Sequence, residues 1–188
     1  MNAHVGSAPT SAAAVANEFL ALGRNDSSAP PIDQMKLQKL LFYAHAWYLA
    51  QTGNPLFEED FEAWPWGPVV RDVYTQTADS GRAPVSKWIS QLTRTTGSNP
   101  FDFNFTTPRV LDEGLGAYIK GVWESHKAFT GTQLSNATHL TGEPWTIVKE
   151  RYGSLDGKPT IPNDLIASVF RQKMANVSST THSAATTG

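Results

Sequence analysis

Apolar residues recur at helical spacing in the first part of the chain. Val15, Phe19 and Leu22 fall at i, i+4 and i+7, a spacing that places side chains on one face of a helix. Gly23 follows them, where a glycine commonly ends a helix. The pattern predicts a first helix over residues 11–22, followed by a loop rich in Ser and Pro.

A longer apolar pattern predicts the main helix. Asp33 is a suitable N-cap, and Gly53-Asn54-Pro55 is typical of a helix end. The apolar stripe between them consists of Leu37, Leu40, Leu41, Ala44 and Tyr48. Phe42, Tyr43 and Trp47 fall outside this stripe, so we expect more than one face of the helix to be buried.

The segment after the main helix changes character. Residues 56–66 are too short and irregular for another long helix and predict a loop with a short strand. Gly67-Pro68 predicts a helix start, because proline suits the first helical turn, where its missing N–H is not needed. Phe101, Phe103 and Phe105 alternate with polar residues, which predicts a short half-buried strand.

The rest of the sequence predicts further helices. Thr107 and Pro108 suit the N-cap and first position of a helix that reaches about Phe129. Shorter helical patterns cover residues 132–140, 144–153 and 163–175. Together these elements predict a mainly α protein: a single compact helical domain with one or two short β elements.

Composition divides the chain into three parts. Residues 1–10 are small and polar and predict a flexible N-terminus, and residues 11–175 form the predicted helical domain. Residues 176–188 are rich in Ser, Thr and Ala and predict a disordered tail. A hydrophobic fraction of 40% and an aromatic fraction of 11% are enough for a core of ordinary size.

Charge and cysteine content narrow the classes of function. A net charge of −2 with no dense run of Lys or Arg argues against nucleic-acid binding. The chain has no cysteine, which excludes disulfides and thiolate chemistry. It shows neither a signal-peptide pattern nor the roughly 20 apolar residues of a membrane span. These features predict a soluble cytoplasmic protein without a membrane partner.

Patterns for catalysis and metal binding are weak. The histidines lack the i, i+4 spacing of a helical zinc site, and His45 lies among core-type residues, which favours a hydrogen-bonded core histidine. Residues 153–160 match a phosphate-binding loop only in part, and a surface turn is the simpler interpretation. Ser135 and His139 lack a nucleophile elbow and an orienting acid. We therefore predict no enzyme activity, no catalytic or metal-binding residue and no cofactor.

Tryptophan and acidic residues give the candidate binding surface. Most of the six tryptophans are expected in the core, because so much aromatic area must be buried. The tryptophans on either side of Pro65 cannot both point into one core from an extended segment. An acidic cluster lies just before them and predicts either a solvated loop edge or a patch that faces a partner. The predicted partner-binding residues are Trp64, Trp66, Glu58, Glu59 and Glu62.

Two blocks of sequence carry a family resemblance. The first comprises Lys36-Leu37-Gln38-Lys39-Leu40-Leu41-Phe42-Tyr43 with Trp47, then Gly53-Asn54-Pro55-Leu56-Phe57, Phe61-Glu62-Ala63-Trp64, and Gly67-Pro68-Val69-Val70 with Tyr74. The second comprises Leu134-Ser135-Asn136-Ala137-Thr138-His139 and Pro144-Trp145. In order and spacing they closely resemble the Panacea domain of SocA-like antitoxins and phage-associated GepA-like proteins, and the likeness covers roughly residues 11–175.

The resemblance implies which residues build the shared fold. We expect the signature residues to be structural: Lys36, Gln38, Lys39, Leu41, Tyr43, Trp47, Gly67, Pro68, His139, Pro144 and Trp145. His139 in particular is expected to hydrogen-bond backbone near Pro144 and Trp145, which would tie two helices together.

The resemblance also implies a function. It implies an antitoxin that neutralises a cognate protein toxin by direct contact, in a family that is common in prophages and pairs with many unrelated toxins. We expect the adjacent gene to encode the toxin. The SocA branch implies an alternative, an adaptor that delivers its toxin to a Clp-type protease. A hydrolase that uses Ser135 and His139 is a third hypothesis, and the sequence leaves the toxin's identity and the oligomeric state open.

Overall fold

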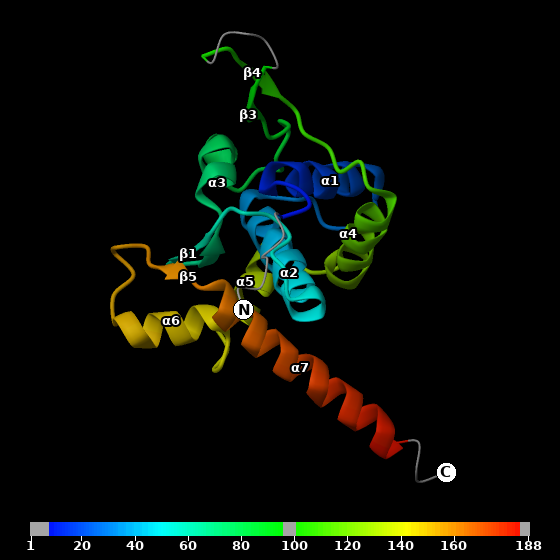
Figure 1. The fold of residues 1–188 in the computed structure, drawn as a ribbon, viewed down its shortest axis with the longest axis vertical. Coiled ribbons are helices and arrows are strands. Elements are labelled where there is room, and N and C mark those ends of the chain that lie inside the picture. The colour runs from blue at the N-terminus through cyan, green and yellow to red at the C-terminus, as the bar shows by residue number, and fades with distance from the viewer. Residues whose placement is uncertain (1–7, 96–100, 185–188) are drawn as a thin grey trace, which may run out of the picture.

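The computed structural model describes residues 8–95 and 101–184, with side chains up to residue 177. Within these ranges the fold is mainly helical, as predicted (Figure 1). The helices are α1 (Ala12–Asn25), α2 (Gln34–Thr52), α3 (Arg71–Thr77), the short 3-10 helix η1 (Ala78–Ser80), α4 (Glu113–His126), α5 (Gly131–Thr138), α6 (Pro144–Tyr152) and α7 (Asn163–Ala184). The strands are β1 (Phe61–Trp64), β2 (Gly67–Val69), β3 (Gln91–Arg94), β4 (Phe103–Thr106) and β5 (Thr160–Ile161). Over the described residues, no helix is both long enough and apolar enough to cross a membrane.

Helix α1 begins where predicted but continues past the predicted end. Ser11 is its N-cap, and its Oγ accepts a hydrogen bond from Ala14 N at 3.3 Å. The helix passes through Gly23 and ends at Asn25, so the predicted stop at Gly23 is wrong. A Cβ at Gly23 would lie 2.6 Å from Ile32 Cδ1. The glycine therefore provides room for close packing and does not end the helix.

Helix α2 is the centre of the fold, and both of its predicted ends are confirmed. Asp33 Oδ1 accepts a hydrogen bond from Lys36 N at 2.7 Å, and Gly53 ends the helix with a left-handed φ of 76°. Every residue from Lys36 to Ala46 is buried, so more than one face is covered, as expected. Helices α1, α4, α5 and α7 all pack against it.

A small antiparallel sheet, in the order β2-β1-β5, lies beside α2. Trp64 pairs with Gly67, so β1 and β2 form a tight hairpin whose turn is Pro65 and Trp66. The predicted helix start at Gly67 is therefore wrong, and α3 begins only at Arg71. Gly67 has a φ of 105°, which favours glycine and suits the turn, and pairing with β1 keeps the next residues extended.

The second hairpin, β3–β4, projects from the helical body (Figure 1). The predicted strand is present as β4, but its predicted half-burial is wrong, because all residues of both strands are exposed. Phe101 lies before β4 and is also exposed. Alternation identified the strand correctly, but whether the body covers its apolar face depends on tertiary structure.

Helix α4 starts later than predicted. Asp112 is its N-cap, with Oδ1 accepting a hydrogen bond from Leu115 N at 2.7 Å, so the predicted start at Thr107 and Pro108 is wrong. The Pro108 carbonyl instead accepts a hydrogen bond from Asn17 Nδ2 at 2.9 Å. This contact holds the segment as the connection between the projecting hairpin and α4.

Helix α7 runs past the predicted domain end at residue 175 and reaches Ala184. No Gly or Pro interrupts residues 163–184, so nothing in the sequence breaks the helix. The structure thus places helix in the first part of the segment expected to be a disordered tail. The outermost parts of the predicted flexible ends, residues 1–7 and 185–188, lie outside the described residues. Figure 1 shows α7 extending from the body on the side away from β3–β4.

Candidate functional site

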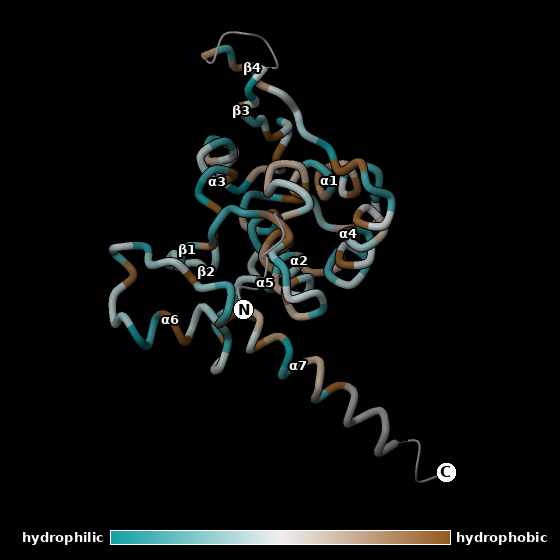
Figure 2. Tube along the Cα trace, viewed as in Figure 1, coloured by the Kyte–Doolittle hydropathy of each residue, from teal (hydrophilic) through white to brown (hydrophobic). Residues whose placement is uncertain are grey.

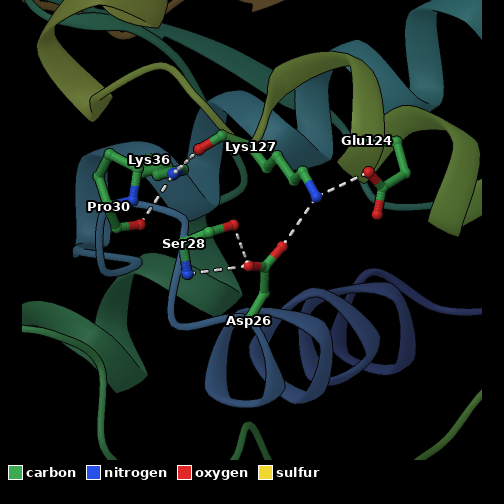
Figure 3. Close-up of polar contacts among 6 residues, drawn as sticks. All are labelled: Asp26, Ser28, Pro30, Lys36, Glu124 and Lys127. Carbon is green, nitrogen blue, oxygen red and sulfur yellow. Dashed lines mark hydrogen bonds and ion pairs between the residues drawn. The ribbon is translucent and has the colours of Figure 1, made fainter.

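The first turns of α2 bury three polar side chains, those of Lys36, Gln38 and Lys39. Buried polar groups are costly unless they are hydrogen-bonded. Lys36 Nζ donates to the carbonyl oxygens of Pro30 at 2.9 Å and Lys127 at 2.7 Å (Figure 3). It therefore joins the loop before α2 to the end of α4.

A charged network surrounds this junction (Figure 3). Lys127 Nζ lies 3.0 Å from Asp26 Oδ2 and 2.7 Å from Glu124 Oε2. Hydrogen bonds from Ser28, and next from Lys127, lower the pKa of Asp26 to about 2. Together with Lys36, the network fixes the α1–α2 loop to the end of α4.

Gln38 and Lys39 hold β2 in the same way. Gln38 Oε1 accepts a hydrogen bond from Val70 N at 2.8 Å, and its Nε2 donates to Val70 O at 3.3 Å. Lys39 Nζ donates to Pro68 O at 2.9 Å, and burial lowers the pKa of Lys39 to about 7. Any side chain on Gly67 would collide with Lys39, because a Cβ there would lie 2.6 Å from Nζ.

The turn between β1 and β2 is fixed by side chains from α5 and α6. Trp145 Nε1 donates to Trp64 O at 2.7 Å, and Ser135 Oγ donates to Trp66 O at 2.8 Å. His139 Nε2 lies 3.3 Å from Pro65 O. Two carbonyls of the turn, those of Trp64 and Trp66, are thus hydrogen-bonded by side chains from α6 and α5, and the His139 ring lies beside the third.

His139 differs from its predicted role in one respect. Its backbone contacts are Ser135 O, 2.6 Å from Nδ1, and Pro65 O, so the expected hydrogen bond near Pro144 is wrong. Its ring packs edge-on against Trp145, with centroids 3.9 Å apart, and this contact does join α5 to α6. Position 139 follows the end of α5, which points the ring at the turn instead of along the chain.

The other signature residues form the core around these contacts. Leu41 is fully buried, and the rings of Tyr43 and His126 stack at 4.7 Å. Trp47 is half-buried against Phe170, at a centroid distance of 4.7 Å. The buried members also include Gly67, Pro68, Pro144 and Trp145. These signature residues therefore lie in the interior of the domain or at its edge, and their structural role stays a prediction.

The structure separates the two tryptophans of the predicted binding surface. Trp66 is 71% exposed. Trp64 is half-buried: its Nε1 donates to Glu62 Oε2 at 2.7 Å, and Lys158 Nζ lies 3.8 Å above its ring. Glu62 also binds Arg71, with Oε1 2.9 Å from Nε. Trp66 is therefore the residue of this group that presents most of its surface to solvent.

The predicted acidic cluster is divided as well. Glu58 accepts a hydrogen bond from Ala8 N at 2.7 Å, and Glu59 accepts one from Ala12 N at 3.1 Å. Burial raises the pKa of Glu59, and the nearby carboxylates of Asp72 and Glu58 also raise it. These two glutamates contact the backbone at the start of α1, whereas Glu62 is in β1, beside the β1–β2 turn.

A pocket of about 370 Å³ opens beside Trp66. Trp64, Trp66 and Val69 line it together with Lys39 and residues from the start of α2. The sequence pointed to the two tryptophans but not to the pocket, because it indicated Lys39 only as a structural signature residue, and the place of Lys39 beside the tryptophans depends on the tertiary fold. The only local signal was its position inside an apolar run of α2.

The structure also arranges the residues considered for catalysis. The Ser135 hydroxyl donates to the Trp66 carbonyl, and His139 faces the Ser135 carbonyl and not its hydroxyl. Residues 153–160 form the connection from α6 to β5. His45 is fully buried, and its Nε2 lies 3.0 Å from Asn163 Oδ1. A search of the described residues finds no group of three or more metal-ligating side chains.

The fold and these contacts define a helical domain whose buried polar signature holds its own backbone. The SocA-like antitoxin model of the Panacea domain matches residues 37–146, and the chain belongs to this family. The chain is also 30% identical over 143 residues to antitoxin SocA of Caulobacter vibrioides (strain NA1000 / CB15N), across 76% of this chain and 72% of that protein. No solved structure matches it significantly. Family membership supports an antitoxin role and implies a toxin as the partner.

Proposed function

We propose that this chain neutralises its cognate toxin by binding it directly. Membership of the SocA-like antitoxin family carries the proposal. The β1–β2 turn supports it, because Trp66 is 71% exposed on a backbone that Ser135 and Trp145 hold by hydrogen bonds. An exposed aromatic residue on a rigid turn loses little conformational entropy on binding, and tryptophan is enriched among residues that dominate interfaces.

The pocket beside Trp66 extends this contact. Val69 and Met35 give it apolar walls, and Arg82 contributes positive charge. A toxin side chain that enters the pocket would pack against Trp66 and Val69. The pocket thus turns a single exposed residue into a concave surface of the kind that anchors an interface.

Co-expression with the adjacent gene tests the proposal. We expect that gene to be toxic alone and harmless together with this chain. Trp66→Ala should weaken or abolish rescue. Trp88→Ala is the matched control, because Trp88 is also exposed, at 39%, and lies outside the pocket. A neighbouring gene that is harmless alone, or that stays toxic beside the wild-type chain, contradicts the proposal.

The toxin's half-life separates the two mechanisms. Neutralisation by masking predicts an unchanged half-life in cells that produce both proteins. A half-life that shortens only when this chain is present supports the alternative of delivery to a Clp-type protease. Measuring toxin decay after translation arrest, in cells with and without the protease, gives the answer.

A further inference from the structure

The β3–β4 hairpin is amphipathic. Leu92 pairs with Phe105 and Arg94 pairs with Phe103, so these four side chains share one face of the ladder. The opposite face carries Gln91, Thr93, Asn104 and Thr106. Figure 2 shows hydrophobic segments on this hairpin, outside the helical body. The hairpin therefore has one face that is apolar except for Arg94, and one polar face.

The apolar face is open to solvent. Leu92 is 54% exposed, Phe103 48% and Phe105 80%. A two-stranded hairpin alone is marginally stable, and adjacent exposed apolar side chains typically mark an interaction surface. A hairpin can bury its apolar face by folding back onto the core, but the strand residues of this hairpin are exposed.

Two side-chain amides hold the hairpin in this position. Asn17 Nδ2 donates to the carbonyls of Ile89 and Pro108, and its Oδ1 accepts from Ile89 N at 2.8 Å. Gln76 of α3 binds Ser90 through both main-chain groups, at 2.9 and 2.8 Å. Asn17 is fully buried. The base of the hairpin is thus fixed, and its apolar face is presented in a defined orientation.

A groove of about 440 Å³ separates this face from α3. Leu92 and Phe105 form one wall, Val73 and Ile89 contribute apolar surface, and Glu59 and Asp72 contribute carboxylates. None of the described residues that line it is Lys or Arg. Within residues 8–95 and 101–184, neither carboxylate forms an ion pair.

We propose that this groove binds a segment of the toxin in which a Lys or Arg stands beside an apolar side chain. The apolar side chain would cover Leu92 and Phe105, and the cation would pair with Glu59 and Asp72. Charge complementarity selects this occupant, because a neutral apolar segment would bury two like charges without a counterion. The inference rests on the proposed function and adds a second contact surface on the side of the molecule that carries α3 and the hairpin.

Binding of the purified toxin, obtained through the co-expression experiment, tests the groove. We expect Phe105→Ser and Asp72→Lys each to weaken the affinity measured by calorimetry by about tenfold or more. Tyr152→Ser and Glu150→Lys are matched controls on α6, both exposed in the free chain, and should leave affinity nearly unchanged. Unchanged thermal unfolding midpoints would show that the variants are folded.

A further variant separates charge from shape. Asp72→Asn keeps the size of the side chain, so it should weaken binding less than Asp72→Lys and reduce the loss of affinity on adding salt. If the wild-type chain fails to neutralise the toxin, the proposed function fails and the groove assignment fails with it. If the wild-type chain binds and the groove variants bind equally well, only the groove assignment is overturned. The groove assignment is also overturned if the groove variants bind toxin normally but differ from the wild type in oligomeric mass without toxin. That result would identify a second copy of the chain as the occupant.

Discussion

The β1–β2 hairpin and the β3–β4 hairpin differ in what surrounds them. The first lies beside α2, and side chains from α2, α5 and α6 bind its backbone. The second extends beyond the helical body, and all its strand residues are exposed. Within one domain, the same type of element serves as part of the folded core in one place and as an exposed surface in the other.

The comparison shows how the family signature is used. Its polar residues Lys36, Gln38 and Lys39 hold carbonyl and amide groups of the β1–β2 region and the α1–α2 loop. Phe103 and Phe105, two aromatic residues outside the signature, remain on the surface. Residues that determine the fold and residues available for a partner are therefore largely separate. Trp66 belongs to both groups, because its carbonyl is bound by the body and its side chain is exposed.

The largest expected effect is loss of stability in the core around the first hairpin. Trp145→Ala removes a ring that is 2% exposed and the hydrogen bond to Trp64 O, and Leu41→Ala leaves a cavity in α2. Each should lower the free energy of unfolding by about 2–5 kcal/mol, measured by denaturant titration. The same change at exposed Trp66 should cost less than about 1 kcal/mol. Equal losses at Trp145 and Trp66 would contradict the assignment of core and surface.

The next effect is a pH dependence caused by Lys39. Burial lowers its pKa to about 7 from 10.5, so between these values the unfolded chain binds a proton that the folded chain does not. Stability should therefore rise with pH from about 7, by at most about 1.4 kcal/mol per pH unit. Burial raises the pKa values of Tyr43 and Tyr118, so above about pH 10.0 these tyrosines ionise in the unfolded chain before they ionise in the folded chain. Their ionisation lowers stability, and the rise in stability caused by Lys39 therefore ends near this pH.

Lys39→Met is the control for this effect. It removes the ionisable group while keeping an unbranched apolar side chain of similar length, so the slope of stability against pH between 7 and 10 should decrease. Denaturant titrations at several pH values measure the slope. Identical slopes in the wild type and the variant would show that Lys39 keeps its ordinary pKa.

The smallest effect on stability is expected in the second hairpin. Phe105→Ser and Leu92→Ser replace exposed apolar side chains, so each should change the free energy of unfolding by no more than about 0.5 kcal/mol. A loss of 2 kcal/mol or more in the free chain would mean that the hairpin is packed against the body. The contrast with Trp145→Ala is thus a direct measure of how differently the two hairpins are supported.

Local sequence patterns predicted much of the fold. Asp33 and Gly53 were recognised as the ends of α2, because capping depends on a few neighbouring residues. The predictions for Gly23 and Gly67 were wrong, because the role of each glycine depends on a residue that is not its neighbour in the sequence. One makes room for Ile32 and the other for Lys39, and both contacts come from residues distant in sequence. Local rules cannot supply those neighbours.

The candidate surfaces were predicted less completely than the fold. The tight turn that exposes Trp66 was not predicted, because Gly67 and Pro68 favoured a helix start. That Trp64 and Trp66 do not both point into the core could be predicted from the sequence. The half-burial of Trp64 could not, because it requires Lys158 and Tyr74 on its ring. Phe103 and Phe105 gave a correct strand pattern and a wrong burial, since alternation states which side chains share a face but not whether anything covers that face.

The way Asn17 is used has a consequence for protein engineering. The Asn17 side chain hydrogen-bonds main-chain atoms of Ile89 and Pro108, which stand before β3 and after β4. These bonds do not depend on the side chains of the hairpin between them. The segment between these residues can thus change in sequence while the hydrogen bonds at its two ends stay the same. A hairpin of different composition, grafted between positions 90 and 107, should be displayed by the unchanged helical body, which makes this domain a scaffold for retargeting recognition without redesigning its interior.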